Sequence, residues 1–321
     1  MAYRGAMKHY VRVWGWLPAV QRRAEYKRRF NRRTSGLRYF TLCGADILDV
    51  KFLAAKGLLE RNMRGYPGVA FCECESETYA EAATKLGATL LPLKMTFEEA
   101  VSRGKLDNYY PFDVYNLDFS RSCFPQNEPP TSQTIDAVTK VIAKQSEKKA
   151  PFDLFFTFVA GYGIENQAVL RILSTYMEDN FAENPSLRQS FEKKFGMRLD
   201  ELVRRRYHEF ILVTFPKLIA FIGQDYGFSM TYMQRFWYKR ERNELQGTYT
   251  YYITKFVFSF DLVSLGRGIR REERKTERLR RNYLAIARES IENDPVNVMR
   301  ELDDKVKAEL EKEVNGLLSS P

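Results

Sequence analysis

The sequence predicts an α/β protein built on a doubly wound, mostly parallel sheet. Three apolar runs typical of buried strands occur at Leu37–Cys43, Gly68–Glu75 and Phe112–Phe119. Each run ends in glycine or polar residues, and each is followed by a segment with helical periodicity. This alternation is the pattern of a parallel sheet with helices on both faces. Because ligands bind at the carboxyl ends of the strands in such sheets, those ends are the first places to look for a site.

The rest of the chain continues the same alternation. Strands are expected at residues 38–43, 69–74, 89–93, 112–119 and 152–159, with helices between them. Two aromatic-rich runs then follow at Phe228–Arg240 and Thr248–Leu262, separated by a short polar turn. Two such runs joined by a turn predict an antiparallel hairpin at the end of the sheet.

Changes in composition divide the chain into three expected parts. Residues 1–37 are expected to form a basic N-terminal arm, residues 38–262 the α/β domain, and residues 263–321 a charged helical C-terminal extension. A helical insertion is expected inside the domain at about residues 164–226. Its helices should break at Asn184-Pro185-Ser186 and at Gly196.

The last helix is expected to start at Asp294-Pro295, where an acid at the N-cap precedes a proline. Its apolar residues fall on one stripe: Met299, Leu302, Val306, Leu310, Val314 and Leu317. We expect this stripe to pack on its own domain. A homodimer or a protein partner held through this helix is the alternative.

Positive charge is concentrated at the N-terminus. Residues 1–38 contain eleven lysines and arginines against one acid, Glu25, so they account for the whole chain's net charge of +10. Cations and aromatic rings alternate there, as expected of a segment that follows a phosphate backbone and stacks on a base. A protein or membrane-surface contact and organelle targeting are the alternatives. The candidate nucleic-acid contacts are Arg22, Arg23, Lys27, Arg28, Arg29, Arg32 and Arg33, interleaved with Tyr26 and Phe30.

Other features of the sequence indicate the cellular compartment and whether a membrane segment or a metal site is expected. No apolar run approaches the ~20 residues of a membrane helix, and the first residues lack the apolar stretch of a secretory signal. Four cysteines fall in or near the expected sheet, which suits reduced thiols in a cytoplasmic protein. With two histidines in the chain, a metal site is not expected. We therefore expect a cytoplasmic protein that does not enter a membrane.

The order of these parts over residues 38–262 resembles the class I S-adenosylmethionine (SAM) methyltransferases, a Rossmann-like family. The resemblance implies SAM as cofactor. It places Gly44 and Ala45 beside the methionine part, Glu73 on the ribose hydroxyls, and Met95 beside the adenine ring. The turn after the first strand departs from the family, because it keeps only Gly44 where several glycines are usual.

A second point of resemblance lies at the end of the fourth strand. Amino-methylating nucleic-acid enzymes carry there a motif that begins with Asp or Asn, contains two prolines and ends in an aromatic residue. Asn116 and Phe119 match its first and last positions, whereas Leu117 and Asp118 replace the prolines. The resemblance implies that Asn116 and Asp118 orient the amine that is methylated. Phe119 would stack on the flipped base.

Two functions follow from the sequence. The first is a SAM-dependent methyltransferase that acts on nucleic acid, DNA or RNA. The second is a catalytically inactive protein of the same fold that serves as a nucleic-acid-binding or assembly subunit. The retained Glu73 and the Asn116/Asp118 pair favour the first function, whereas the shortened glycine turn favours the second.

Overall fold

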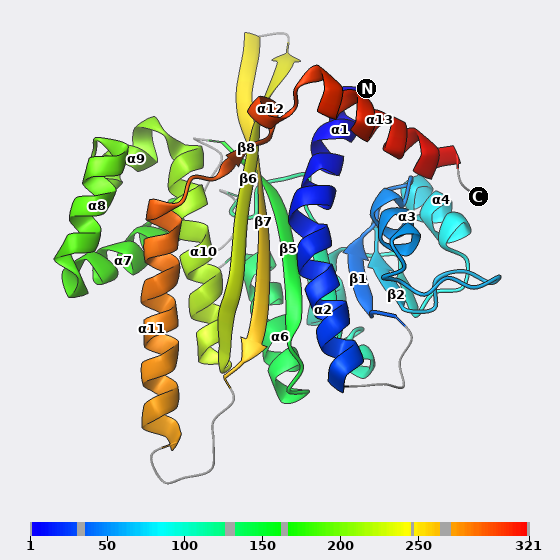
Figure 1. Ribbon diagram of the computed structural model, residues 1–321, viewed down its shortest axis with the longest axis horizontal. Helices are drawn as coiled ribbons and strands as arrows, with labels where there is room; N and C mark the ends of the chain where they lie inside the picture. The colour runs from blue at the N-terminus through cyan, green and yellow to red at the C-terminus, as the bar shows by residue number, and fades with distance from the viewer. Residues whose placement is uncertain are drawn as a thin grey trace. The chain divides into compact units, whose positions relative to one another are not determined.

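A computed structural model of the chain describes residues 2–30, 36–125, 132–161, 166–244, 247–263 and 271–319 (Figure 1). The chain divides into two units. Unit 1 comprises Met1–Asp118, Phe152–Phe156 and Asn297–Pro321, and unit 2 comprises Phe119–Pro151 and Thr157–Val296. This division differs from the expected arm, domain and extension, because both ends of the chain belong to unit 1.

The expected α/β sheet is present. In the described part of the chain, eight strands are hydrogen-bonded in the order β3-β2-β1-β4-β5-β7-β6-β8. Unit 1 contains the parallel part, in which β1 pairs with β2 and β4, and β2 pairs with β3. The strands of this part are β1 (Tyr39–Leu42), β2 (Val69–Cys72), β3 (Leu91–Leu93), β4 (Val114–Asp118) and the first residues of β5 (Phe152–Ala160).

Short helices connect the strands of unit 1: α3 (Leu48–Ala55), α4 (Ser76–Leu86) and α5 (Phe97–Ser102). Their starts follow from side chains that accept backbone N–H groups. The Glu75 carboxylate accepts from the N–H groups of Glu77 and Thr78, so Glu75 caps α4. The Thr96 hydroxyl accepts from the N–H of Glu99 and caps α5.

The basic N-terminal segment is an integral helix of unit 1 rather than a separate arm. It consists of α1 (Ala2–Val11), a π-helical turn (Arg12–Trp16) and α2 (Leu17–Phe30), which run on continuously in Figure 1. Its apolar face is fully buried at Val11 and Val20. The Trp16 ring stacks on Phe155 with ring centroids 5.0 Å apart. Burial of this face holds the segment to the sheet.

The C-terminal residues also pack within unit 1. The expected start at Asp294-Pro295 is instead followed by the two-residue strand β8 (Val296–Asn297). The helices after it are α12 (Val298–Glu301) and α13 (Asp304–Ser319). Leu310, Val314 and Leu317 of the expected stripe are buried in α13, which contacts α1 and α3, whereas Met299 is exposed.

Unit 2 contains the expected hairpin, formed by the antiparallel strands β6 (Phe228–Glu244) and β7 (Gly247–Leu262). The expected insertion is helical and breaks at Pro185 and at Gly196, whose φ of +67° is favourable for glycine. The helices of unit 2 are α6 (Gln133–Glu147), α7 (Gln167–Glu183), α8 (Pro185–Phe195), α9 (Leu199–Arg205), α10 (Tyr207–Asp225) and α11 (Arg271–Glu292). In the described residues the insertion forms four of these helices, α7 to α10.

A buried arginine explains why α11 belongs to unit 2. Arg235 of β6 donates to the carbonyl oxygens of Leu212 in α10 (2.9 Å) and Ser290 in α11 (2.8 Å). It also donates to the carbonyl of Asn293, just beyond α11. The charged guanidinium is thus satisfied by backbone acceptors from two helices. None of the described helices combines the length and apolarity needed to cross a membrane.

His208 of α10 is a second buried group in unit 2. Its ring stacks on Tyr252 of β7 with centroids 3.7 Å apart, and its side chain is 11% exposed. Burial, together with a smaller effect of the Arg206 charge, lowers the pKa of His208 from 6.5 to about 4. The imidazole is therefore neutral in the folded protein at neutral pH.

Replacing His208 with phenylalanine should keep the ring stacking and remove this titration. Below pH 6.5 the unfolded chain takes up a proton on His208 that the folded protein excludes until about pH 4. The wild type should therefore lose up to about 3 kcal/mol relative to His208→Phe as pH falls through this window. Urea unfolding of both proteins at pH 7, 5.5 and 4 checks the difference, and a constant difference would contradict the assignment.

Candidate functional site

The turn after β1 lies at the carboxyl edge of the sheet in unit 1. It is closed by the N–H of Ile47, which donates to the carbonyl of Gly44 (3.0 Å). Gly44 is exposed, and a Cβ added to it would meet only the Asp46 Oδ1, at 3.7 Å. The Ala45 carbonyl accepts from Lys85 Nζ of α4 (2.6 Å). The turn therefore leaves open space at Gly44, while Lys85 holds its Ala45 end.

Ile47 is strained at this turn. Its φ of 46° and ψ of 30° are left-handed, a conformation that β-branched residues rarely adopt. Such a residue costs about 1–3 kcal/mol and persists only where its surroundings hold it. Here the side chain is fully buried and the residue forms the N-cap of α3. Strain of this kind gathers at binding sites, and this turn is where the resemblance places the cofactor.

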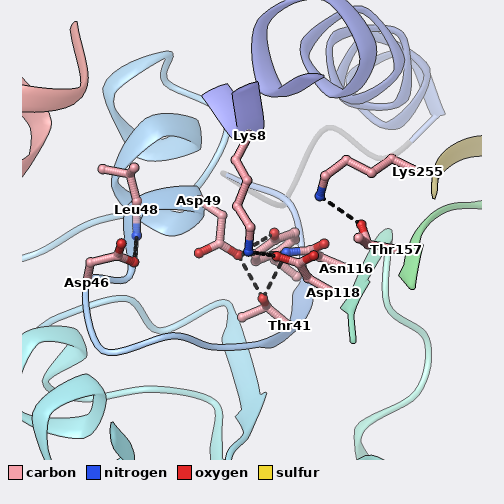
Figure 2. A network of polar contacts seen from close by, with 10 residues as sticks. Lys8, Thr41, Asp46, Leu48, Asp49, Asn116, Asp118, Thr157 and Lys255 are labelled. Atoms are coloured by element: carbon pink, nitrogen blue, oxygen red, sulfur yellow. Dashed lines mark hydrogen bonds and ion pairs between the residues drawn. The ribbon is translucent and has the colours of Figure 1, made fainter. Parts of the chain in front are cut away.

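A buried carboxylate connects the turn to β4 (Figure 2). Asp49 of α3 directs its Oδ2 at three donors from neighbouring strands. These are the Tyr39 hydroxyl (2.8 Å), the Thr41 hydroxyl (2.7 Å) and the Asn116 Nδ2 (3.0 Å). The Asn116 Nδ2 also donates to Thr41 Oγ1 (3.2 Å). Side chains from β1, α3 and β4 are therefore locked together at the carboxyl edge.

This network fixes the orientation of the Asn116 amide. Its NH₂ group must face Asp49, because the opposite orientation would set the amide oxygen against the carboxylate. Both N–H bonds are then used, one for Asp49 and one for Thr41. The amide oxygen, Oδ1, is buried and has no hydrogen-bond partner among the described residues. Asn116 therefore presents an unsatisfied acceptor on β4, two residues before the strand ends, at a position where the sequence predicts a catalytic residue.

The other two predicted catalytic residues lie in different units. Asp118, two residues beyond Asn116 on β4, pairs with Lys8 Nζ of α1 at 2.7 Å, as Figure 2 shows. Phe119 begins unit 2, where its N–H donates to the carbonyl of Thr157 (3.0 Å). The Phe119 ring is buried, so it packs in the interior of the protein in this structure.

Glu73 and Met95 follow the ends of β2 and β3, and both are half-buried. Glu73 Oε1 accepts from the N–H of Glu75 (2.8 Å), which holds the side chain near the strand end. Burial raises the pKa of the Cys43 thiol, and negative charge on Asp46 and Glu73 acts in the same direction. Glu73 thus lies within electrostatic range of the end of β1, next to the Gly44 turn.

The predicted nucleic-acid contacts divide into two groups. Arg23 and Lys27 have internal partners: Arg23 donates to Asp153 (3.0 Å), and Lys27 donates to Asp113 (2.6 Å). Both side chains therefore stabilise unit 1. Three others lie on exposed positions of α2, and the last two fall outside the described residues. The exposed cations are Arg22, Arg28 and Arg29; those outside the described part are Arg32 and Arg33.

Two buried residues of the N-terminal helix escaped the sequence interpretation. His9 is fully buried, and its Nε2 lies 3.0 Å from Glu313 of α13. Burial lowers the pKa of His9, although the hydrogen bond to Glu313 opposes the shift. Arg12, one turn further on, is 7% exposed. Both are polar residues on an apolar helix face, and this pattern could have indicated that they are buried. A search for cations on the surface does not find it.

Within the described ranges, no three or more His, Cys, Asp and Glu side chains are arranged to hold a metal ion. Comparison with family models finds one match, to the PP_RS20740-like family over residues 6–89. The matched segment runs from α1 to just beyond α4, so it includes Arg12, the Gly44 turn, Asp49 and Glu73. A comparison with curated proteins found no match.

The Asp49–Asn116 contact can be tested by exchanging its two groups. Asn116→Asp should destabilise the protein by about 3 kcal/mol at pH 7, because it buries a second carboxylate against Asp49. The double variant Asp49→Asn/Asn116→Asp restores one amide and one carboxylate, and should recover more than half of the loss. Urea unfolding measures both effects. If the loss of stability in the double variant equals the sum of the losses in Asp49→Asn and Asn116→Asp, the two side chains do not interact.

Proposed function

We propose that unit 1 is a SAM-dependent methyltransferase module that acts on an amino group of nucleic acid. The proposal rests on the unsatisfied Asn116 oxygen, two residues before the carboxyl end of β4 and beside Thr41 of β1. In the order β3-β2-β1-β4-β5, the chain changes direction across the sheet between β1 and β4. Ligands of doubly wound sheets bind at this switch point. The β6–β7 hairpin that follows the parallel strands is part of the order of elements that resembles the SAM methyltransferases.

The residues around the switch point suit an adenosine-containing cofactor. Glu73 follows β2 and offers a half-exposed carboxylate for the two ribose hydroxyls. The open turn at Gly44 allows a ligand to approach the backbone, because no neighbouring atom occupies the place of a Cβ except at 3.7 Å. Met95, after β3, would flank the adenine ring. When bound, SAM would supply an electrophilic methyl group.

The end of β4 would orient the amine that receives the methyl group. The Asn116 oxygen can accept one N–H bond of an exocyclic amine, because both its own N–H bonds are already used by Asp49 and Thr41. This fixed acceptor would direct the nitrogen lone pair by holding its hydrogens. Asp118, paired with Lys8, would place a carboxylate beside the acceptor and could take the released proton.

Calorimetry with SAM and S-adenosylhomocysteine tests the cofactor site. Glu73→Ala should weaken binding by about 10- to 100-fold, the effect of losing a hydrogen bond to a charged group. Glu147→Ala is the matched control, because it removes an exposed carboxylate of α6 in unit 2 and should leave affinity unchanged. Absence of binding by the folded wild type, or equal binding by Glu73→Ala, would contradict the proposal.

A non-enzymatic nucleic-acid-binding or assembly subunit is the second candidate, and a specific observation favours it. The turn after β1 keeps one glycine, and its Ala45 carbonyl is occupied by Lys85. Such a protein would bind nucleic acid but not SAM. The nucleic-acid surface would be the same under either function. It would be formed by Arg22, Tyr26 and Arg29, which share one face of α2 at i, i+4 and i+7, with Arg28 beside them.

Point substitutions test this surface. Deletion of residues 1–38 would also remove the buried Val11, Trp16 and Val20, and would therefore unfold unit 1. The variant Arg22→Ala/Arg28→Ala/Arg29→Ala keeps those residues. It should reduce the slope of log K against log salt by about 2–3, since each phosphate contact contributes about 0.9.

The charge-matched control is Arg278→Ala/Arg280→Ala/Arg281→Ala on exposed positions of α11. Binding of an oligonucleotide is measured by fluorescence anisotropy between 50 and 300 mM salt, roughly the range in which phosphate contacts change affinity most. The α11 variant should keep the wild-type slope. Equal slopes for the α2 variant and the wild type would exclude the proposed surface.

A further inference from the structure

Arg12 is a buried cation without an anionic partner. Its side chain is 7% exposed, and its Nε and Nη1 atoms are fully buried without a hydrogen bond to any described residue. No carboxylate of the described chain pairs with it within 4.0 Å. The guanidinium lies over the buried Trp16 ring, 5.7 Å from its centroid. A cation–π contact of this length leaves the N–H groups unsatisfied.

The other buried arginines of the described chain, unlike Arg12, have hydrogen-bond acceptors. Arg23, on the same helix and 6% exposed, donates to Asp153 and to the carbonyl of Phe152. Arg235 of unit 2 donates to several backbone carbonyls. An arginine cannot lose its proton in a protein, so burial without partners is strongly unfavourable. Arg12 is therefore a donor group that lacks its acceptor, rather than a structural cation.

Arg12 lies one helical turn from a residue that reaches the carboxyl edge of the sheet. Lys8 lies one turn before it on the same helix face, and Lys8 reaches Asp118 at the end of β4. Burial raises the pKa of Tyr39, and the positive charge of Arg12 opposes that shift. Arg12 is thus within electrostatic range of Tyr39, one of the donors to Asp49. The same charge contributes to the lowered pKa of His9.

The local backbone supports a functional role for this position. Arg12 begins the π-helical turn Arg12–Trp16 between α1 and α2. Such turns are rare, and they occur frequently at functional sites. The wider turn changes the direction of the side chains that follow it. Lys8, before the turn, pairs with Asp118, whereas Trp16, at its end, stacks on Phe155 of β5.

We propose that Arg12 binds an oxyanion, either a carboxylate or a phosphate, of the small molecule held at the carboxyl edge of unit 1. The planar guanidinium fits both groups through paired N–H bonds, and in a buried site such bonds are strong. The inference rests on the proposed function for the rest of the ligand. If that ligand is SAM, the oxyanion is the carboxylate of its methionine part.

Thermal unfolding of Arg12→Met tests the inference, because methionine keeps the apolar stem and removes the charge. In a buffer without phosphate or carboxylate, the variant should have a Tm equal to or above that of the wild type. A structural arginine behaves in the opposite way: Arg23→Met is the control and should lower Tm by at least about 5 °C, because it leaves Asp153 buried without its partner. A Tm of Arg12→Met that falls like that of Arg23→Met would overturn the inference.

The same scan with ligands identifies the oxyanion. The probes are inorganic phosphate, adenosine 5′-monophosphate and S-adenosylhomocysteine. At least one should raise the wild-type Tm by about 2–4 °C or more. That rise should disappear in Arg12→Met and return in part in Arg12→Lys.

If S-adenosylhomocysteine raises the Tm of the wild type, the oxyanion that Arg12 binds is a carboxylate. If only phosphate or adenosine 5′-monophosphate raises the Tm, the oxyanion is a phosphate. That result supports the oxyanion site and contradicts SAM as the cofactor. Equal rises in the wild type and Arg12→Met would overturn the role of Arg12 while leaving the proposed function intact. No rise with any probe in the wild type would overturn the oxyanion site.

Discussion

The carboxyl edge of unit 1 depends on the Asp49 carboxylate. Three donors, from Tyr39, Thr41 and Asn116, meet at one of its oxygens. Because a buried carboxylate is stable only when hydrogen bonds replace water, these donors must keep their positions for the protein to fold. This contact joins α3 to two adjacent strands. It also turns the Asn116 amide so that its oxygen has no hydrogen-bond partner among the described residues. Stability and the site therefore share one interaction.

The sequence was sufficient to predict the alternating strands and helices, the hairpin, and the helix breaks at Pro185 and Gly196. These features come from local apolar periodicity and from residues with restricted backbones. The packing of the N-terminal helix could not be predicted in the same way. Its π-helical turn interrupts the 3.6-residue period, and the partner of Arg23, Asp153, is 130 residues away. Composition alone therefore made this helix resemble a basic arm distinct from the domain.

The candidate site was predictable only where it follows strand ends. Glu73 and Asn116 were found because each comes after or near the end of an apolar run. Asp49 was missed, because an acid in the first turn of a helix usually faces solvent and serves the helix dipole. Arg12 and His9 were missed because their burial depends on contacts with distant strands and with α13. The site is formed by long-range pairs, which no local pattern in a single sequence reports.

Hydrogen–deuterium exchange with and without S-adenosylhomocysteine tests the central claim, a ligand site at the carboxyl edge of unit 1, most directly. It reports each segment separately and needs no substrate. We expect slower exchange in the Gly44–Leu48 turn, in residues 73–75 and at the end of β4, with unit 2 unchanged. Slower exchange confined to unit 2, or none anywhere at saturating ligand, would contradict the claim.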